Sequence, residues 1–187
     1  MKEGLKSIGE GAFWGCSNLV SINIPSTVKE IPSHAFWNCD KLVSVEIPKG
    51  VTYIGEMAFW YIDNLVSVHI AGTVKEIGKQ AFGACYLLSN VTIDEGVQII
   101  GERAFESARE MKEVTIPSTV KRIDAYAFSS VLNNLTTVYL LPKPPIDLGE
   151  NALGKTSNLK IYVPTAYLED YKKYHPAYEQ YFYDGNF

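Results

Sequence analysis

The sequence predicts an α/β repeat solenoid, in which coils of 23 residues stack on one another and each coil contributes one short parallel strand. Three observations carry this prediction. The dipeptide Ala-Phe recurs six times at a constant interval of 23 residues. Apolar and polar residues alternate at the same place in each repeat. The chain of 187 residues is 47% hydrophobic and 20% charged, which is typical of a folded protein.

The repeat also predicts the core. The Ala-Phe pairs begin at Ala12, Ala35, Ala58, Ala81, Ala104 and Ala127. Further apolar columns keep the same register, and they start at Ile8, Leu19, Ile22, Ile24 and Val28. One coil cannot bury its own apolar flank, so the coils have to stack. Each large side chain that they bury contributes roughly 1.5–3 kcal/mol, so stability grows with the number of coils.

The strand of each coil is predicted from alternation of period two, as in Leu19-x-x-Ile22-x-Ile24. A single strand per repeat has to pair with the equivalent strand of the next coil, in parallel and in register. Proline follows the strand in several repeats and marks where the pairing stops, because it has no N–H to donate. These prolines are Pro25, Pro48, Pro117 and Pro164.

A turn column before Ala-Phe contains glycine at Gly9, Gly55, Gly78 and Gly101. The same column contains Pro32 and Asp124. Because proline fixes φ near −65°, this turn does not require a left-handed residue. We therefore expect glycine to permit a close backbone approach here.

The two ends differ from the repeats. Residues 1–141 form the 23-residue repeats, with one inserted residue after Phe128, and residues 142–187 form a degenerate last repeat and a helical cap, all in one continuous domain. Thr165 is predicted to cap a helix over residues 166–174. Leu168, Tyr171, Tyr174 and Tyr178 recur at helical spacing. This helix either buries the open end of the solenoid or presents an aromatic docking face.

Residues 1–4 show no apolar core of a signal peptide, so we expect either further protein upstream or fraying of the first coil. No run of 18 apolar residues exists, which argues against membrane insertion. The formal net charge of −4 argues against a general nucleic-acid binder.

The three cysteines share one column, which predicts a core position. Cys16, Cys39 and Cys85 alternate there with Ile62, Ala108 and Val131. We expect free, buried thiols that are poor nucleophiles. Neighbouring coils lie about 4.8 Å apart, so distance alone leaves a bridge between Cys16 and Cys39 open.

The unit I-G-x-x-A-F-x-x-C-x-x-L-x-x-V-x-I-P, as in residues 8–25, resembles the BspA-like leucine-rich repeat. The likeness is close over residues 5–141 and loose over residues 142–175. It implies a right-handed, curved leucine-rich repeat solenoid on secreted or surface-anchored bacterial proteins. Such proteins are often linked to adhesion to host matrix proteins or to other cells.

No pattern in the sequence indicates catalysis or a cofactor. His34, His69 and His175 fall in different columns, and no metal-ligand spacing or nucleophile motif is present. We therefore predict no catalytic residue and no metal ligand. His69 points outward beside Glu46 and Thr92. It is interpreted as a solvated strand residue, with a pH-sensitive contact or a metal at a partner interface as the alternatives.

Two surfaces could bind a ligand. Trp14, Trp37 and Trp60 each follow a core phenylalanine, in a column that later holds Gly83, Glu106 and Ser129. A column that accepts these residues is not a core column, so the indoles are predicted to form an exposed or half-exposed ridge, with Tyr61 beside it. Alternatively, the rings lie flat and cover neighbouring core edges. The second surface is the outward strand face, with His69, Tyr139 and Tyr162, which could equally be a soluble sheet surface.

Taken with the resemblance, these features predict a noncatalytic binding module that is secreted or displayed at the cell surface. The expected partner is a host matrix or cell-surface protein, another cell or a glycan. The missing upstream part of the same chain could also occupy the ridge. The alternative is a structural stalk or spacer that positions another domain.

Overall fold

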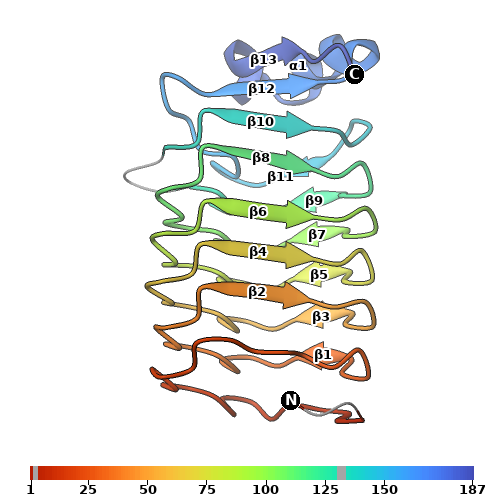
Figure 1. The fold of residues 1–187 in the computed structure, drawn as a ribbon. Helices are drawn as coiled ribbons and strands as arrows, with labels where there is room; N and C mark the ends of the chain where they lie inside the picture. Colours follow the sequence, from red (N-terminus) through yellow and green to blue (C-terminus); the bar gives the residue numbers. More distant parts are fainter. Residues whose placement is uncertain (2–3, 130–133) are drawn as a thin grey trace.

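The computed structural model describes residues 1, 4–129 and 134–187. The chain winds into stacked coils that follow the sequence from one end to the other (Figure 1). Each regular coil has a four-residue strand and a two-residue strand whose arrows point in opposite directions. The predicted α/β repeat solenoid is therefore confirmed. Its second strand was not predicted, because two residues are too few to show an alternation.

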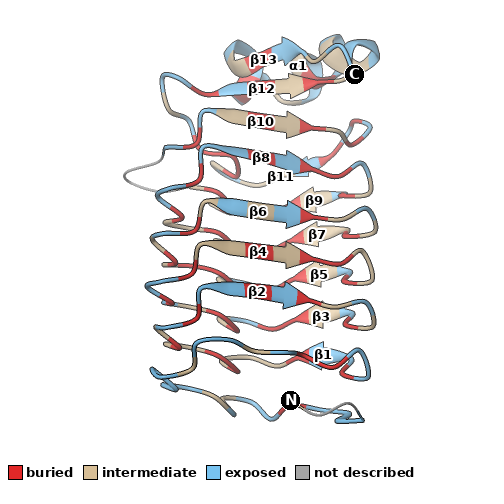
Figure 2. Ribbon diagram, viewed as in Figure 1, coloured by how far each residue is buried: buried red, intermediate tan, exposed pale blue. Residues whose placement is uncertain are grey.

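The long strands are β2 (Ser44–Ile47), β4 (Ser67–Ile70), β6 (Asn90–Ile93), β8 (Glu113–Ile116), β10 (Thr137–Leu140) and β12 (Lys160–Val163). The short strands are β1 (Glu30–Ile31), β3 (Tyr53–Ile54), β5 (Glu76–Ile77), β7 (Ile99–Ile100), β9 (Arg122–Ile123) and β11 (Asp147–Leu148). All pairings between coils are parallel, and equivalent residues face each other, as Val45, Val68 and Val91 do. Figure 2 shows how buried and accessible residues alternate along the long strands.

A third backbone ladder runs through the Ala-Phe turns. The N–H of Phe36 donates to the carbonyl of Ala58 at 2.8 Å, and the same bond recurs from coil to coil. The phenylalanine rings stack in one column with centroids 4.9 to 5.4 Å apart. Parallel offset rings at this spacing attract one another beyond the area that they bury. The Ala-Phe column thus forms a continuous stack that runs through the core.

The glycine turn behaves as predicted. A Cβ at Gly55 would lie 2.5 Å from the backbone nitrogen of Ser33, and none of the column's glycines has a positive φ. Left-handed residues occur instead in two other columns of the same turn, such as Met57 at φ 52° and Tyr61 at φ 58°. Each costs about 1–2 kcal/mol in a non-glycine residue, so packing has to hold this turn in place.

All three cysteines are free thiols, as expected. Cys39 and Cys85 are buried, and burial raises their pKa to about 11 and about 12. Cys16 is exposed, so the expectation of a core position is wrong there, because no described coil packs against the outer side of the first coil. Val131 of the same column lies outside the described residues.

The C-terminal segment folds over the last coil. It consists of η1 (Thr165–Tyr167), α1 (Leu168–Tyr174), η2 (Pro176–Tyr181) and β13 (Phe182–Asp184), which pairs with β12. Tyr171 is fully buried, and its hydroxyl donates to the carbonyl of Pro142. Tyr178 is also buried, whereas Tyr174 is exposed, which favours a cap over a docking face. Thr165 does not cap α1, because its hydroxyl donates to Asp184 instead.

Candidate functional site

Aromatic side chains form a continuous group along the turn edge of the first four coils. We call this group the aromatic ridge, and it comprises Trp14, His34, Trp37, Trp60, Tyr61 and Tyr86. The tryptophans directly follow the core phenylalanines, and the N–H of Gly15 donates to the carbonyl of Trp37 at 2.8 Å. The backbone ladder therefore sets the spacing of the rings, as the 23-residue interval predicts.

The ridge rings contact one another in sequence. Trp14 and Trp37 stack with centroids 4.6 Å apart and planes 4° apart. Trp60 meets Trp37 edge to face at 5.0 Å, and Tyr61 stacks on Trp60 at 5.2 Å. Tyr86 follows Tyr61 at 6.1 Å. Much of each inner ring face is therefore already occupied by a neighbouring ring.

Exposure varies along the ridge. Trp14 is 59% exposed, whereas Trp37 and Trp60 are half-buried. Trp60 leans onto the next coil, where a Cβ at Gly83 would lie only 3.1 Å from its Cδ1. The change from tryptophan to glycine at position 83 thus makes room for the indole of the preceding coil. The two sequence interpretations both describe part of the ridge, because Trp60 covers a neighbour while Trp14 projects into solvent.

Acidic residues lie near the ridge. His34 packs on Trp37 at 5.1 Å, and its Nδ1 lies 3.5 Å from Oε1 of Glu10. Asp40 follows Trp37 by three residues, and Asp63 follows Trp60 in the same way. Sequence reasoning missed these two aspartates and Tyr86, although they share one repeat column and could have been found from it.

His69 lies between two carboxylates on the strand face. Its Nδ1 is 2.7 Å from Oε1 of Glu46, and its Nε2 is 3.0 Å from Oδ1 of Asp94. The hydrogen bond to Asp94, with support from Glu46, raises the pKa of His69. Both ring nitrogens donate only when the imidazole is protonated, so this geometry suits the charged form. The sequence pointed to Glu46 and Thr92 but did not identify Asp94.

The tyrosines of the strand face lie farther along the solenoid. Tyr139 stacks on Tyr162 at 5.6 Å, and Tyr183 of β13 extends the row at 5.9 Å from Tyr162. Phe187 contacts Tyr139 edge to face at 6.0 Å. The predicted site residues therefore form three separate groups, namely the ridge, the His69 cluster and the tyrosine row. Their roles in binding stay predictions.

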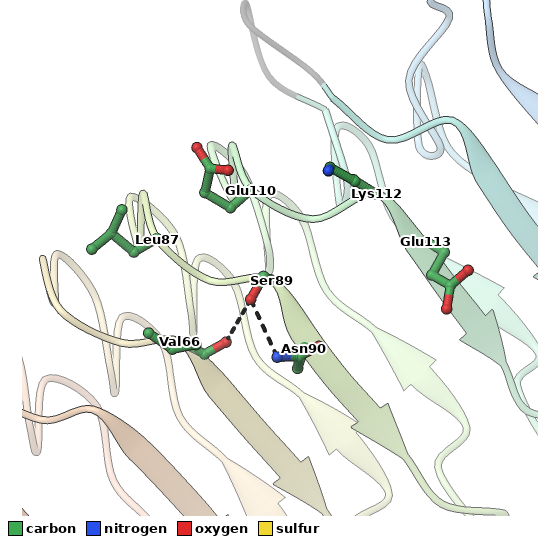
Figure 3. A pocket seen from close by; sticks show the side chains of 7 residues that line it. All are labelled: Val66, Leu87, Ser89, Asn90, Glu110, Lys112 and Glu113. Carbon is green, nitrogen blue, oxygen red and sulfur yellow. Dashed lines mark hydrogen bonds between the residues drawn. The ribbon is translucent and has the colours of Figure 1, made fainter.

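A groove of about 630 Å³ opens where β6 and β8 lie side by side (Figure 3). Its lining residues are Val66, Leu87, Ser89, Asn90, Glu110, Lys112 and Glu113. In Figure 3, Glu110 and Glu113 lie well apart with Lys112 between them. A catalytic site needs converging ionisable groups near one reacting atom, and the groove does not bring these groups together.

Within residues 1, 4–129 and 134–187, no group of three or more His, Cys, Asp and Glu side chains is placed to hold a metal ion. In the same ranges, no helix has the length and apolar character needed to cross a bilayer.

Comparison with known protein families decides the identity of the repeat. Residues 1–106 and 75–175 match the BspA type leucine rich repeat region, in six copies. The chain belongs to the BspA-type leucine-rich repeat family. Comparison with curated proteins finds no match.

Several solved structures share the fold of this BspA-type chain. A leucine-rich repeat protein from Bacteroides ovatus is 21% identical, with a TM-score of 0.60 over 96% of this chain and 56% of that one. One from Eubacterium ventriosum is 24% identical, with a TM-score of 0.71 over 80% and 40%. The T. pallidum leucine rich repeat protein is 24% identical, with a TM-score of 0.63 over 83% and 80%. The chain thus spans about half the length of the first two relatives.

Proposed function

We propose that this chain is a noncatalytic module that binds proteins outside the cell, with the aromatic ridge as its main contact surface. The resemblance to BspA-like proteins supports a secreted or surface-displayed location and a host matrix or cell-surface protein as the partner. The single observation that carries the proposal is the exposure of Trp14, at 59%, next to a continuous row of rings. Exposed aromatic groups of this kind mark contact surfaces.

The stacking within the ridge favours a protein over a glycan. A sugar ring binds by lying flat on an aromatic face, and the stacking of Trp14 on Trp37 at 4.6 Å leaves a wide open face only on the outer side of Trp14. A protein partner can instead pack against the ring edges and the exposed side of Trp14. Tryptophan and tyrosine are also the residues that most often dominate protein interfaces.

A structural stalk or spacer is the second proposed function. The regular hydrogen bonds between coils favour it, because they give a solenoid the stiffness that a spacer needs. In this case the ridge strengthens the stacking of the coils and contacts no partner.

A binding screen with a Trp14→Ser variant separates the two functions. The screen uses immobilised matrix proteins, cell-surface proteins and glycans. Trp14 is the residue to change because Trp37 is packed between other rings and its loss would also destabilise the fold. We expect at least one protein to bind, and Trp14→Ser to weaken that binding about tenfold while the unfolding midpoint moves by less than about 2 °C.

Tyr174→Ser is the matched control, because it removes an exposed aromatic residue of the C-terminal cap. It should leave the binding unchanged. A folded wild-type chain that binds nothing in the screen would support the stalk instead.

A further inference from the structure

Two carboxylates near the aromatic ridge have no cationic partner within the described part of the chain. Asp40 and Asp63 occupy equivalent positions in neighbouring coils. Among the described residues, neither one takes part in an ion pair. The nearby Lys41 does not neutralise them, since its Nζ donates to Oδ1 of Asn18 at 2.9 Å.

This arrangement works against stability. Oδ1 of Asp40 is covered and accepts no hydrogen bond. Burial and the charge of Asp63 raise the pKa of Asp40. A carboxyl group whose pKa is raised by folding lowers the free energy of unfolding once the pH is high enough to ionise it. Groups that destabilise a fold without a packing role are typical of sites that serve a function.

The other charged residues around the tryptophans do not neutralise the negative charge of Asp40 and Asp63. Glu10 lies against His34, and Glu56 is exposed. Arg109, a described cation farther along the ridge, is placed over the ring of Tyr86 at 4.4 Å. The part of the ridge that contains Trp14, Trp37 and Trp60 therefore combines one exposed and two half-buried indoles with an excess of negative charge.

We propose that this part of the ridge binds a basic segment of a partner protein. Arginine and lysine have apolar stems that pack along indole rings and cationic heads that pair with carboxylates. In the bound state the heads lie at Asp40 and Asp63 and relieve their mutual repulsion. A guanidinium group also stacks on the exposed side of Trp14, as cations do on tryptophan. This inference rests on the proposed function and adds the chemical class of the partner.

Two synthetic peptides test the charge requirement. One alternates arginine with leucine, and the other replaces each arginine with neutral citrulline. Binding to the full chain is followed by tryptophan fluorescence. We expect the arginine peptide to bind at least about tenfold more tightly than the citrulline peptide, and its affinity to fall about tenfold between about 50 mM and about 300 mM NaCl.

A double variant, Asp40→Asn with Asp63→Asn, gives two readouts of opposite sign. It should weaken binding of the arginine peptide about fivefold and raise the midpoint of thermal unfolding. Glu179→Gln is the control, because it removes one negative charge from an exposed position in η2 at the other end of the solenoid. It should leave both quantities unchanged.

Several results would overturn the inference. Equal binding of the two peptides, or binding that does not respond to salt, would mean that apolar contact alone is recognised. Unchanged peptide binding by the double variant would exclude Asp40 and Asp63 as the recognition groups. In each case the proposed function still stands if a protein partner is lost with Trp14→Ser. If neither peptide binds and no protein in the screen binds, both this inference and the proposed protein-binding function are rejected.

Discussion

Two joints between neighbouring coils differ in how well their long strands pair. At the joint of β4 and β6 all four residues of each strand are in register, and the N–H of Asp94 donates to the carbonyl of Ile70 at 3.0 Å. At the joint of β6 and β8 no ladder forms, so the long-strand sheet is split into β2-β4-β6 and β8-β10-β12-β13. The difference shows that a regular repeat produces stacked coils without producing equal joints.

The residue directly after each strand accounts for much of this difference. Asp94 follows β6 and donates its N–H, whereas Pro117 follows β8 and has none to give to Ile93. Pro48 directly follows β2, which likewise does not pair with a long strand of the preceding coil. Pro164 ends β12, whose pairing with β10 stops one residue short of Leu140. A proline directly after a strand thus weakens the pairing of that strand with the strand of the preceding coil. The loss ranges from one residue pair at Pro164 to the whole ladder at Pro117.

The split also extends to the start of the strands. The N–H of Asn90 donates to the carbonyl of Val66 at 3.1 Å, and that of Thr137 donates to Lys112 at 3.1 Å. In the described structure no equivalent bond joins Glu113 to Ser89, which is where the groove of Figure 3 opens. The short strands still pair across this joint, as Ile99 does with Arg122.

A side chain partly replaces the missing ladder. The carboxylate of Glu95 accepts hydrogen bonds from the N–H and hydroxyl of Ser118, both at 2.9 Å, and from the N–H of Thr119 at 3.2 Å. Burial opposes the ionised form, but these hydrogen bonds together lower the pKa of Glu95. We call this arrangement the Glu95 staple.

The largest expected effect comes from Ala71→Pro, which places proline after β4. The N–H of Ala71 now donates to the buried carbonyl of Ile47 at 3.2 Å, and proline would leave that carbonyl without a partner. We expect a loss of about 2 kcal/mol in the free energy of unfolding and faster hydrogen exchange in β4. Urea denaturation and exchange measured by mass spectrometry check these outcomes.

Ala71→Gly is the control for this change, because it keeps the N–H and removes only a methyl group. It should lower stability by about 1 kcal/mol or less and leave exchange in β4 slow. If Ala71→Pro leaves all four pairs of β2 and β4 protected, proline is not the cause of a split joint.

A smaller effect is expected from Glu95→Ala, which removes the staple. Two backbone donors and one hydroxyl lose a charged acceptor at a solvent-exposed site, so we expect a loss of about 1 kcal/mol. Exchange should rise around Ser118 and Thr119 and stay unchanged in β2 and β4. A uniform rise along the whole solenoid would contradict a local role for Glu95.

The control is Glu102→Ala, which breaks the exposed ion pair with Lys79 at 3.1 Å and should cost only a few tenths of a kcal/mol. The staple also predicts a direction with pH. Because folding lowers the pKa of Glu95, its contribution is present above its ordinary pKa and is lost as the pH falls through the lowered value.

The His69 cluster on β4 should respond to pH in the opposite direction. Folding raises the pKa of His69 above 6.5, so its contribution is complete below pH 6.5 and is lost as the pH rises through the higher, folded value. The side chain is 38% exposed, and solvent screening limits the effect to about 0.5 kcal/mol. His69→Gln should remove this part of the pH dependence in denaturation curves. An unchanged curve would show that the bonds to Glu46 and Asp94 do not stabilise the fold.

The sequence was sufficient for the features that each coil repeats. Burial of one phenylalanine and several branched residues at the same position of every coil requires the coils to stack, and the structure follows that register. Tryptophan spacing predicted the ridge for the same reason. The packing of Trp60 against Gly83 and the hydrogen bond between His69 and Asp94 depend on the side-chain rotamers of neighbouring coils. Aligned repeat positions in a sequence do not determine these rotamers. Strand β13 was missed because its three residues lie outside the repeat.

The smallest net effect is expected from Pro117→Ala, the reverse of the first change. Alanine supplies an N–H for Ile93 and gains about 1 kcal/mol from the new bond, but it loses a similar amount because the unfolded chain becomes more flexible. Global stability should therefore change by less than about 0.5 kcal/mol, while exchange in β6 and β8 slows. Slow exchange in Pro117→Ala without added stability would mean that β6 and β8 stay unpaired in the wild-type chain because position 117 lacks one hydrogen-bond donor. If exchange stays fast, the missing bond between Glu113 and Ser89 is an independent cause of the split, since the strands then stay apart even when the donor at position 117 is restored.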